Sequence, residues 1–209
     1  FYEDANKGIQ FLKSGDSKNT IPSKAEIIWD DGRELTAQGV AAHSSAPELG
    51  DNAIIKLCNY LGEESGVDFV RFVNEYLSGD GFGSKLGLDD GSDHFNGEYV
   101  GSTTAVPTVL ALEDGGVRLV INVRQRFGTT EADIISAIAA YSESYRFHFE
   151  ITEYMDAMLI NRDLPFLQVM SQIHEEYGVP VGFEVAPGTS YAKSMDRFVS
   201  WGPVFQGEP

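Results

Sequence analysis

The chain has 209 residues, of which 42% are hydrophobic and 22% are charged, so it can bury a real core and is not expected to be disordered. Its formal net charge of -17 repels phosphate backbones and anionic membrane surfaces, which excludes nucleic acid as an expected partner. The single cysteine, Cys58, cannot form an internal disulfide, and no apolar run is long enough to span a bilayer. These features predict a cytoplasmic protein with no membrane partner.

The first half of the chain is expected to form two strands followed by helices. Alternating or apolar runs predict strands over residues 25–29 and 34–43, joined by a turn at residues 30–32. A helix over residues 54–61 follows, with Gly62 as its stop. Its apolar residues recur at i, i+3, i+4 and i+7, namely at Ile54, Leu57, Cys58 and Leu61.

A second helix is expected over residues 69–77, with Asp68 as its N-cap, and residues 79–98 read as a polar loop rich in glycine and aspartate. The second half then repeats the earlier order. A hairpin turn at residues 114–116 joins two strands, 104–113 and 118–124.

A helix with an apolar stripe at Ile134, Ile138 and Tyr141 follows the capping threonines Thr129 and Thr130. A further strand is predicted over residues 147–152 by alternation of apolar and polar side chains. Two strand-strand-helix units in succession indicate a weak internal repeat. They predict an α+β fold in which antiparallel sheets are covered by helices.

The last part of the chain differs from the repeat. Asp163 as a cap and an early Pro165 predict a helix that extends to about Tyr177. The glycine-rich remainder has only two short apolar runs, so residues from about 158 onward look like part of another domain. The abrupt start at Phe1 and end at Pro209 suggest a fragment of a longer protein.

His43 is the sharpest candidate for a functional residue. It closes an apolar strand and precedes Ser44, Ser45 and Pro47, which favour a turn that exposes the imidazole. A histidine in that position can donate a hydrogen bond to an oxyanion or bind a metal, and an ordinary surface or core histidine is the alternative. No nucleophile elbow accompanies the serines, so a serine hydrolase is discounted.

Arg124 ends the strand RLVINVR on the face opposite the apolar side chains. Its guanidinium could hold a carboxylate in a forked pair, or form an ion pair with one of the chain's own 32 acidic residues. The segment GTSYAK, residues 188–193, could form a backbone-amide nest for an anion or an ordinary turn. The other three histidines, His94, His148 and His174, have no second ligand at metal spacing.

Four segments in this order resemble the zinc metallopeptidases of the aminoacylase and carboxypeptidase family, and in particular the PepV-type dipeptidases. They are GVAAHSSAPELGDNA (39–53), VINVR (120–124), PGTSYAK (187–193) and GPVFQGEP (202–209). The resemblance implies that residues 1–157 form a two-layer lid of two related halves. Residues 158–209 would then return to an α/β catalytic domain.

By motif, the family's oxyanion-stabilising lid histidine falls on His43 and its carboxylate-binding arginine on Arg124. Its substrate loop falls on Gly188, Thr189 and Ser190, although the PepV type usually has Gly-Gly-Thr-Tyr where this chain has Pro-Gly-Thr-Ser-Tyr. The substrate would be a dipeptide or an N-acyl amino acid.

The family uses two zinc ions, and its metal ligands and general base are not found in this sequence. The parent protein is therefore expected to be a dipeptidase and this chain alone to be inactive. The alternatives are a non-catalytic binding or dimerisation module with the same fold, or a parent that has lost its metal site. The sequence predicts no particular oligomeric state.

Overall fold

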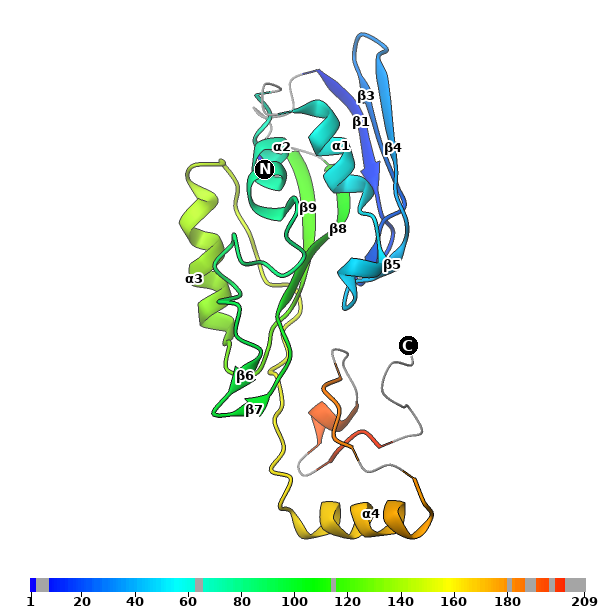
Figure 1. Cartoon of the computed structure of the whole chain (residues 1–209). Helices are drawn as coiled ribbons and strands as arrows, with labels where there is room; N and C mark the ends of the chain where they lie inside the picture. Colours follow the sequence, from blue (N-terminus) through cyan, green and yellow to red (C-terminus); the bar gives the residue numbers. More distant parts are fainter. Residues whose placement is uncertain are drawn as a thin grey trace.

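The structure, a computed structural model, describes residues 1–2, 8–62, 66–113, 116–179, 182–186, 191–195 and 198–201. Its centre is a five-stranded antiparallel sheet in the order β4-β3-β1-β8-β9 (Figure 1). These strands are β1 (Ile9–Ser14), β3 (Lys24–Trp29), β4 (Glu34–Gln38), β8 (Thr104–Glu113) and β9 (Gly116–Arg124). Two small pairs lie outside it: β2 (Thr20–Ile21) with β5 (Ala42–His43), and β6 (His94–Phe95) with β7 (Glu98–Tyr99).

Helices pack against the sheet through a shared hydrophobic core, which confirms the predicted α+β class. They are α1 (Ala53–Leu61), α2 (Asp68–Phe72), which continues as the π-helical turn η4 (Val73–Leu77), and α3 (Glu131–Ser142). Buried side chains of the helices, such as Leu57, Phe69 and Ile134, share this core with Ile27 and Leu110 of the strands. Within the five-stranded sheet, the hairpins β3–β4 and β8–β9 are thus each followed in the chain by a helix that packs on the sheet.

Gly62 at the end of α1 and Thr130 at the start of α3 act as the sequence predicts, whereas the cap of α1 by Asn52 was not predicted. The Asn52 side chain accepts a hydrogen bond from the Ile54 amide at the start of α1, and Gly62, with a φ of 69°, ends it. Thr130 and Asp133 form a reciprocal capping box at the start of α3.

The prediction for Asp68 is wrong, because Val67 holds the N-cap position of α2. The Asp68 side chain is instead buried, and its carboxylate lies 2.6 Å from Nε of Arg146 and 3.4 Å from NH1 of Arg71. A buried carboxylate requires such partners, and Arg146 arrives from the far end of α3.

The strand expected over residues 34–43 is interrupted. At Gly39 the chain leaves β3, and Val40 exchanges backbone hydrogen bonds of 2.8 and 2.9 Å with Asp51. A Cβ on Gly39 would lie 1.9 Å from the Asp51 carbonyl oxygen, so only glycine permits this crossing. At Ala42 the chain enters β5, which pairs with β2 and carries His43 off the main sheet.

The strand expected over residues 147–152 is also wrong, since these residues join no ladder with any described part of the chain. The alternation is nevertheless real: Phe147 is buried, and Phe149 and Ile151 pack against the core. An extended segment that lies along a core surface produces the same pattern as a half-buried strand.

Beyond Met155 the chain runs away from the sheet to α4 (Pro165–Glu176), with the short η5 (Tyr191–Ser194) near the end of the described chain (Figure 1). Pro165 occupies the first turn as predicted, but the N-cap is Leu164 rather than Asp163. The division into 1–157 and 158–209 stays a prediction. No helix in the described ranges has the length and hydropathy of a bilayer-crossing segment.

Candidate functional site

The backbone around His43 is fixed from both sides. His43 pairs with Thr20 in the β2–β5 ladder, and the Ser44 amide donates to the Asn19 carbonyl oxygen at 2.9 Å. The chain then turns through a short 3₁₀ segment, η2 (Pro47–Leu49), as the Ser-Ser-x-Pro sequence predicts. A Cβ on Gly50 would lie 2.9 Å from that of Ala42, so this loop packs closely on β5.

Asn52 attaches the end of this loop to the central sheet. Its side-chain oxygen caps α1, and its amide nitrogen donates to the Pro107 carbonyl oxygen of β8 at 2.7 Å. Residues 43–52, the His43 loop, are therefore anchored to β8, the strand next to β9, and β9 carries Arg124.

The structure brings His43 and Arg124 together, although 81 positions separate them in the sequence. Arg124 is the last residue of β9, and its NH2 lies 3.4 Å from Nε2 of His43. Its Nε donates to the Ser44 hydroxyl oxygen at 3.1 Å. The Ser44 hydroxyl, which is completely buried, in turn donates to Oδ1 of Asn122 at 2.9 Å.

The environment of this pair keeps the imidazole uncharged near neutral pH. Partial burial and, secondly, the positive charge of Arg124 lower the pKa of His43 below its ordinary value of 6.5. Burial also lowers the pKa of the Arg124 guanidinium, which remains charged because its ordinary value is so high. The site therefore combines a neutral imidazole with a permanent positive charge.

A neutral imidazole donates from one nitrogen and accepts at the other. Nδ1 of His43 lies 2.6 Å from the Ser45 hydroxyl oxygen, and the Ser45 amide also points to Nδ1, at 3.4 Å. When Nδ1 accepts from Ser45, the proton is on Nε2, and NH2 of Arg124, which can only donate, then makes no hydrogen bond with Nε2 across their 3.4 Å separation. In this tautomer both groups are donors toward a ligand that lies between them.

The Ser45–His43 contact does not make a serine hydrolase. A catalytic base must become positively charged when it takes the serine proton, and a carboxylate normally stabilises that charge. In the described residues the nitrogen of His43 remote from Ser45 faces a guanidinium, which disfavours the charged imidazole. A hydrogen-bond donor role fits this environment better.

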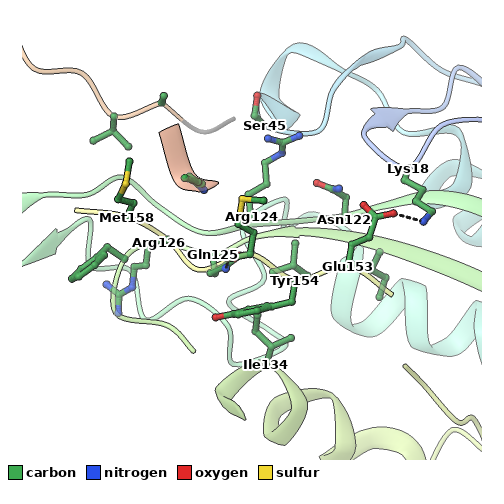
Figure 2. Close-up of a pocket in the computed structure, with 18 of the residues that line it drawn as sticks. Lys18, Ser45, Asn122, Arg124, Gln125, Arg126, Ile134, Glu153, Tyr154 and Met158 are labelled. Atoms are coloured by element: carbon green, nitrogen blue, oxygen red, sulfur yellow. Dashed lines mark hydrogen bonds and ion pairs between the residues drawn. The ribbon is translucent and has the colours of Figure 1, made fainter. Parts of the chain in front are cut away.

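Ser45, Asn122 and Arg124 line a cleft between the outer face of β9 and the extended segment that follows Ile151 (Figure 2). Two contacts join its walls: an ion pair of 2.7 Å between Lys18 and Glu153, and a hydrogen bond of 2.7 Å from the Gln125 amide to the Met155 carbonyl oxygen. The part of the cleft around Arg124 is thus lined by polar side chains.

Sequence reasoning missed Ser44 and Asn122 as members of this site. Asn122 stands two residues before Arg124, and alternation along a strand places both on one face, which is the signal that could have found it. Gly188, Thr189 and Ser190 of the expected substrate loop lie outside the described residues.

Within the described ranges, no three His, Cys, Asp or Glu side chains are grouped so that they could hold a metal ion. The other histidines have different contacts: His94 with Asp93, His148 with the Tyr2 ring, and His174 with the Trp201 indole nitrogen. The described residues therefore do not form the two-zinc site that the resemblance implies.

No model of a protein family matches the chain. Individual relatives do: "Putative dipeptidase YtjP" of Bacillus subtilis is 30% identical over 202 residues, which cover 93% of this chain and 42% of the relative. Proteins of the same descriptive name from Staphylococcus saprophyticus and Staphylococcus haemolyticus are 27% and 26% identical over 193 residues, 39% of each. The chain is thus similar along most of its length to proteins named putative dipeptidases, and it spans about two fifths of their length.

Proposed function

We propose that the full-length protein hydrolyses the amide bond of a dipeptide or an N-acyl amino acid, and that this chain supplies the lid that holds the substrate. The observation that carries the proposal is the contact between His43 and Arg124, two residues that were singled out independently in the sequence. The similarity to proteins named putative dipeptidases supports the same class of reaction.

In this proposal the two side chains divide the substrate between them. The Arg124 guanidinium pairs with the substrate's carboxylate, a group that its fork geometry suits. The Nε2–H of His43 donates to the carbonyl oxygen of the scissile bond as it becomes an oxyanion. Loss of one such donor typically costs about 2.7–4 kcal/mol of transition-state stabilisation.

The described residues offer no metal site, so zinc enters the proposal only through the rest of the protein. The resemblance implies two zinc ions, whose ligands would belong to segments outside this chain. Residues 1–157 would form the lid and residues 158–209 part of the catalytic domain. The chain alone would then be inactive.

The first test compares the 209-residue chain with the full-length protein for zinc content and dipeptide hydrolysis, side by side. We expect only the full-length protein to bind zinc, about two ions as a two-metal site requires, and to cleave dipeptides. If the full-length protein does neither, the hydrolase proposal is wrong and a binding or assembly role replaces it.

The second test is His43→Ala in the full-length protein, for which we expect kcat to fall roughly 10²- to 10³-fold. His94→Ala is the matched control, because His94 is also exposed but lies in β6 and contacts Asp93. Equal turnover of the His43 variant and the wild type would remove the oxyanion role.

A further inference from the structure

Ser44 has an unusual position for a serine that no catalytic step uses. Its side chain is completely buried, yet the one arginine it contacts reaches the cleft. It belongs to the His43 loop, whereas both of its side-chain partners, Asn122 and Arg124, belong to β9. The hydroxyl is therefore a direct polar link between the His43 loop and β9.

The geometry of the link assigns each atom a role. A serine hydroxyl has one proton and two lone pairs. Donation of the proton to Oδ1 of Asn122, at 2.9 Å, directs a lone pair toward Nε of Arg124, at 3.1 Å. Asn122 thus fixes the orientation of the Ser44 hydroxyl, and the hydroxyl holds Arg124.

Holding Nε has a specific consequence for an arginine. The guanidinium is planar, so a hydrogen bond at Nε fixes the direction of the whole group. Because Nε is engaged by Ser44, a carboxylate ligand has to contact the terminal nitrogens, and one of these lies 3.4 Å from Nε2 of His43. The distance between the carboxylate subsite and the imidazole donor is then set by Ser44.

We infer that Ser44 is a positioning residue that orients the Arg124 guanidinium toward a substrate carboxylate beside His43, through its buried contacts with Asn122 and Arg124. This inference rests on the proposed function for the identity of the ligand. It makes recognition of the carboxylate depend on a hydroxyl that never touches the substrate.

The test uses the full-length protein with alanyl-alanine and its C-terminal amide, which differ in the carboxylate alone. We expect Ser44→Ala to raise KM for the dipeptide about tenfold while KM for the amide and both kcat values change little, since a hydrogen bond to a charged group is lost. Unchanged discrimination between acid and amide would overturn the inference.

Ser14→Ala is the matched control. Ser14 is also a buried serine, and its hydroxyl donates to the Lys24 carbonyl oxygen at 2.8 Å on β1, away from Arg124. This variant should lose stability without a change in the preference for the acid. If it shifts that preference as Ser44→Ala does, the effect is one of stability and the inference fails.

A double-mutant cycle separates positioning from a merely structural role. Once Arg124 is replaced by alanine, Ser44 has nothing to orient, so Ser44→Ala with Arg124→Ala should show the same KM for the dipeptide as Arg124→Ala alone. Additive effects on KM would overturn the inference. If Ser44→Ala folds too poorly, Ser44→Cys keeps nearly the same volume with a weaker acceptor and should give the same results.

A measurement on the 209-residue chain distinguishes failure of this inference from failure of the proposed function. The Nε–H resonance of Arg124, assigned with Arg124→Lys, should exchange slowly with solvent and should exchange about tenfold faster in Ser44→Ala but not in Ser14→Ala. If the full-length protein cleaves neither substrate, the proposed function is wrong. The exchange rate still shows whether the Ser44 hydroxyl holds Nε of Arg124. Equal rates in wild type and Ser44→Ala would overturn it.

Discussion

At the scale of single residues, the site is defined by a neutral histidine next to a charged arginine. Both His43 and Arg124 are recognisable in the sequence, one from a turn signal and one from its place at a strand end. Their contact is not, because it depends on how β5 and β9 approach each other across 81 positions. Ser44 was discounted as a nucleophile, and its burial between the two strands has no local signal.

The lowered pKa of His43 predicts a titration midpoint below 6.5. Because the arginine's charge contributes to the shift, Arg124→Ala should move the midpoint upward, which NMR titration of the imidazole carbons can measure. Arg118→Ala is the control: this arginine lies on the same strand but pairs with Glu113, and it should leave the midpoint unchanged. Equal midpoints in wild type and Arg124→Ala would contradict the electrostatic account.

The same shift predicts how His43 affects stability. Below about pH 6.5, His43 binds a proton in the unfolded chain but not yet in the folded one, because its pKa is lower when folded. The free energy of unfolding therefore falls as the pH drops from about 6.5 through the lowered pKa of the folded state. His43→Ala should remove this contribution and make stability less dependent on pH in that window. Urea denaturation at pH 7 and pH 5 measures the difference. A steeper loss in the variant than in the wild type would contradict the sign.

At the scale of elements, Asn52 holds the end of the loop that follows His43. Asn52 both caps α1 and donates to Pro107 of β8. Asn52→Ala should therefore lower the free energy of unfolding by about 1–2 kcal/mol, the upper range for a cap. Chemical denaturation checks this, with Asn59→Ala as control, because Asn59 is exposed on the same helix and its side chain accepts an exposed hydrogen bond from the Ser78 hydroxyl instead of capping the helix. A smaller loss for Asn52→Ala than for Asn59→Ala would show that the cap does not stabilise the loop.

Gly39 determines where the chain leaves the sheet to reach the site. An alanine there would place Cβ 1.9 Å from the Asp51 carbonyl oxygen, which must move and take the Val40–Asp51 pairing with it. Gly39→Ala should cost about 1–3 kcal/mol of stability, as overpacking does. Gly182→Ala is the control, since its added Cβ would lie 3.9 Å from its nearest neighbour, a side-chain oxygen of Glu184. Thermal unfolding measures the stability of both variants. Equal melting temperatures would show that the close approach of Gly39 to the Asp51 carbonyl oxygen does not require a glycine.

Periodicity predicted the helices well and the strands less well. The signals at α1 and α3 are local, since caps and apolar stripes act within one element. The segment 147–152 shows the limit: its alternation comes from packing of Phe147, Phe149 and Ile151 against the core, while its backbone pairs with none of the described strands. Side-chain alternation reports which face is buried, not whether a hydrogen-bonded neighbour exists.

At the scale of the whole molecule, the repeat predicted the two hairpins and the α+β class but not the order of the sheet. β1 (Ile9–Ser14) joins the two hairpins by pairing with β3 on one side and β8 on the other. Its register shifts between Ile9 and Phe11, which breaks the simple alternation that would have indicated a strand. The sheet order depends on these long-range pairings, which no short window of sequence contains.

The described chain is unevenly buried, and this separates α4 from the rest. α3 and α4 both have 12 residues, but Ile134 of α3 is buried and Ile138 and Tyr141 pack against the core. In α4 only Leu167 is buried, whereas Phe166, Val169 and Ile173 are exposed by 37%, 53% and 40%. A helix of this length has little stability in water without tertiary contacts.

We therefore expect the α4 amides of the 209-residue chain to exchange with solvent at least about tenfold faster than those of α3. Hydrogen exchange followed by mass spectrometry measures both helices in one sample, so α3 serves as the internal control. If residues 158–209 belong to the catalytic domain, α4 should become as protected as α3 in the full-length protein, because the exposed apolar side chains would then be covered. Equal exchange of the two helices in the chain alone would show that α4 is stable without that domain.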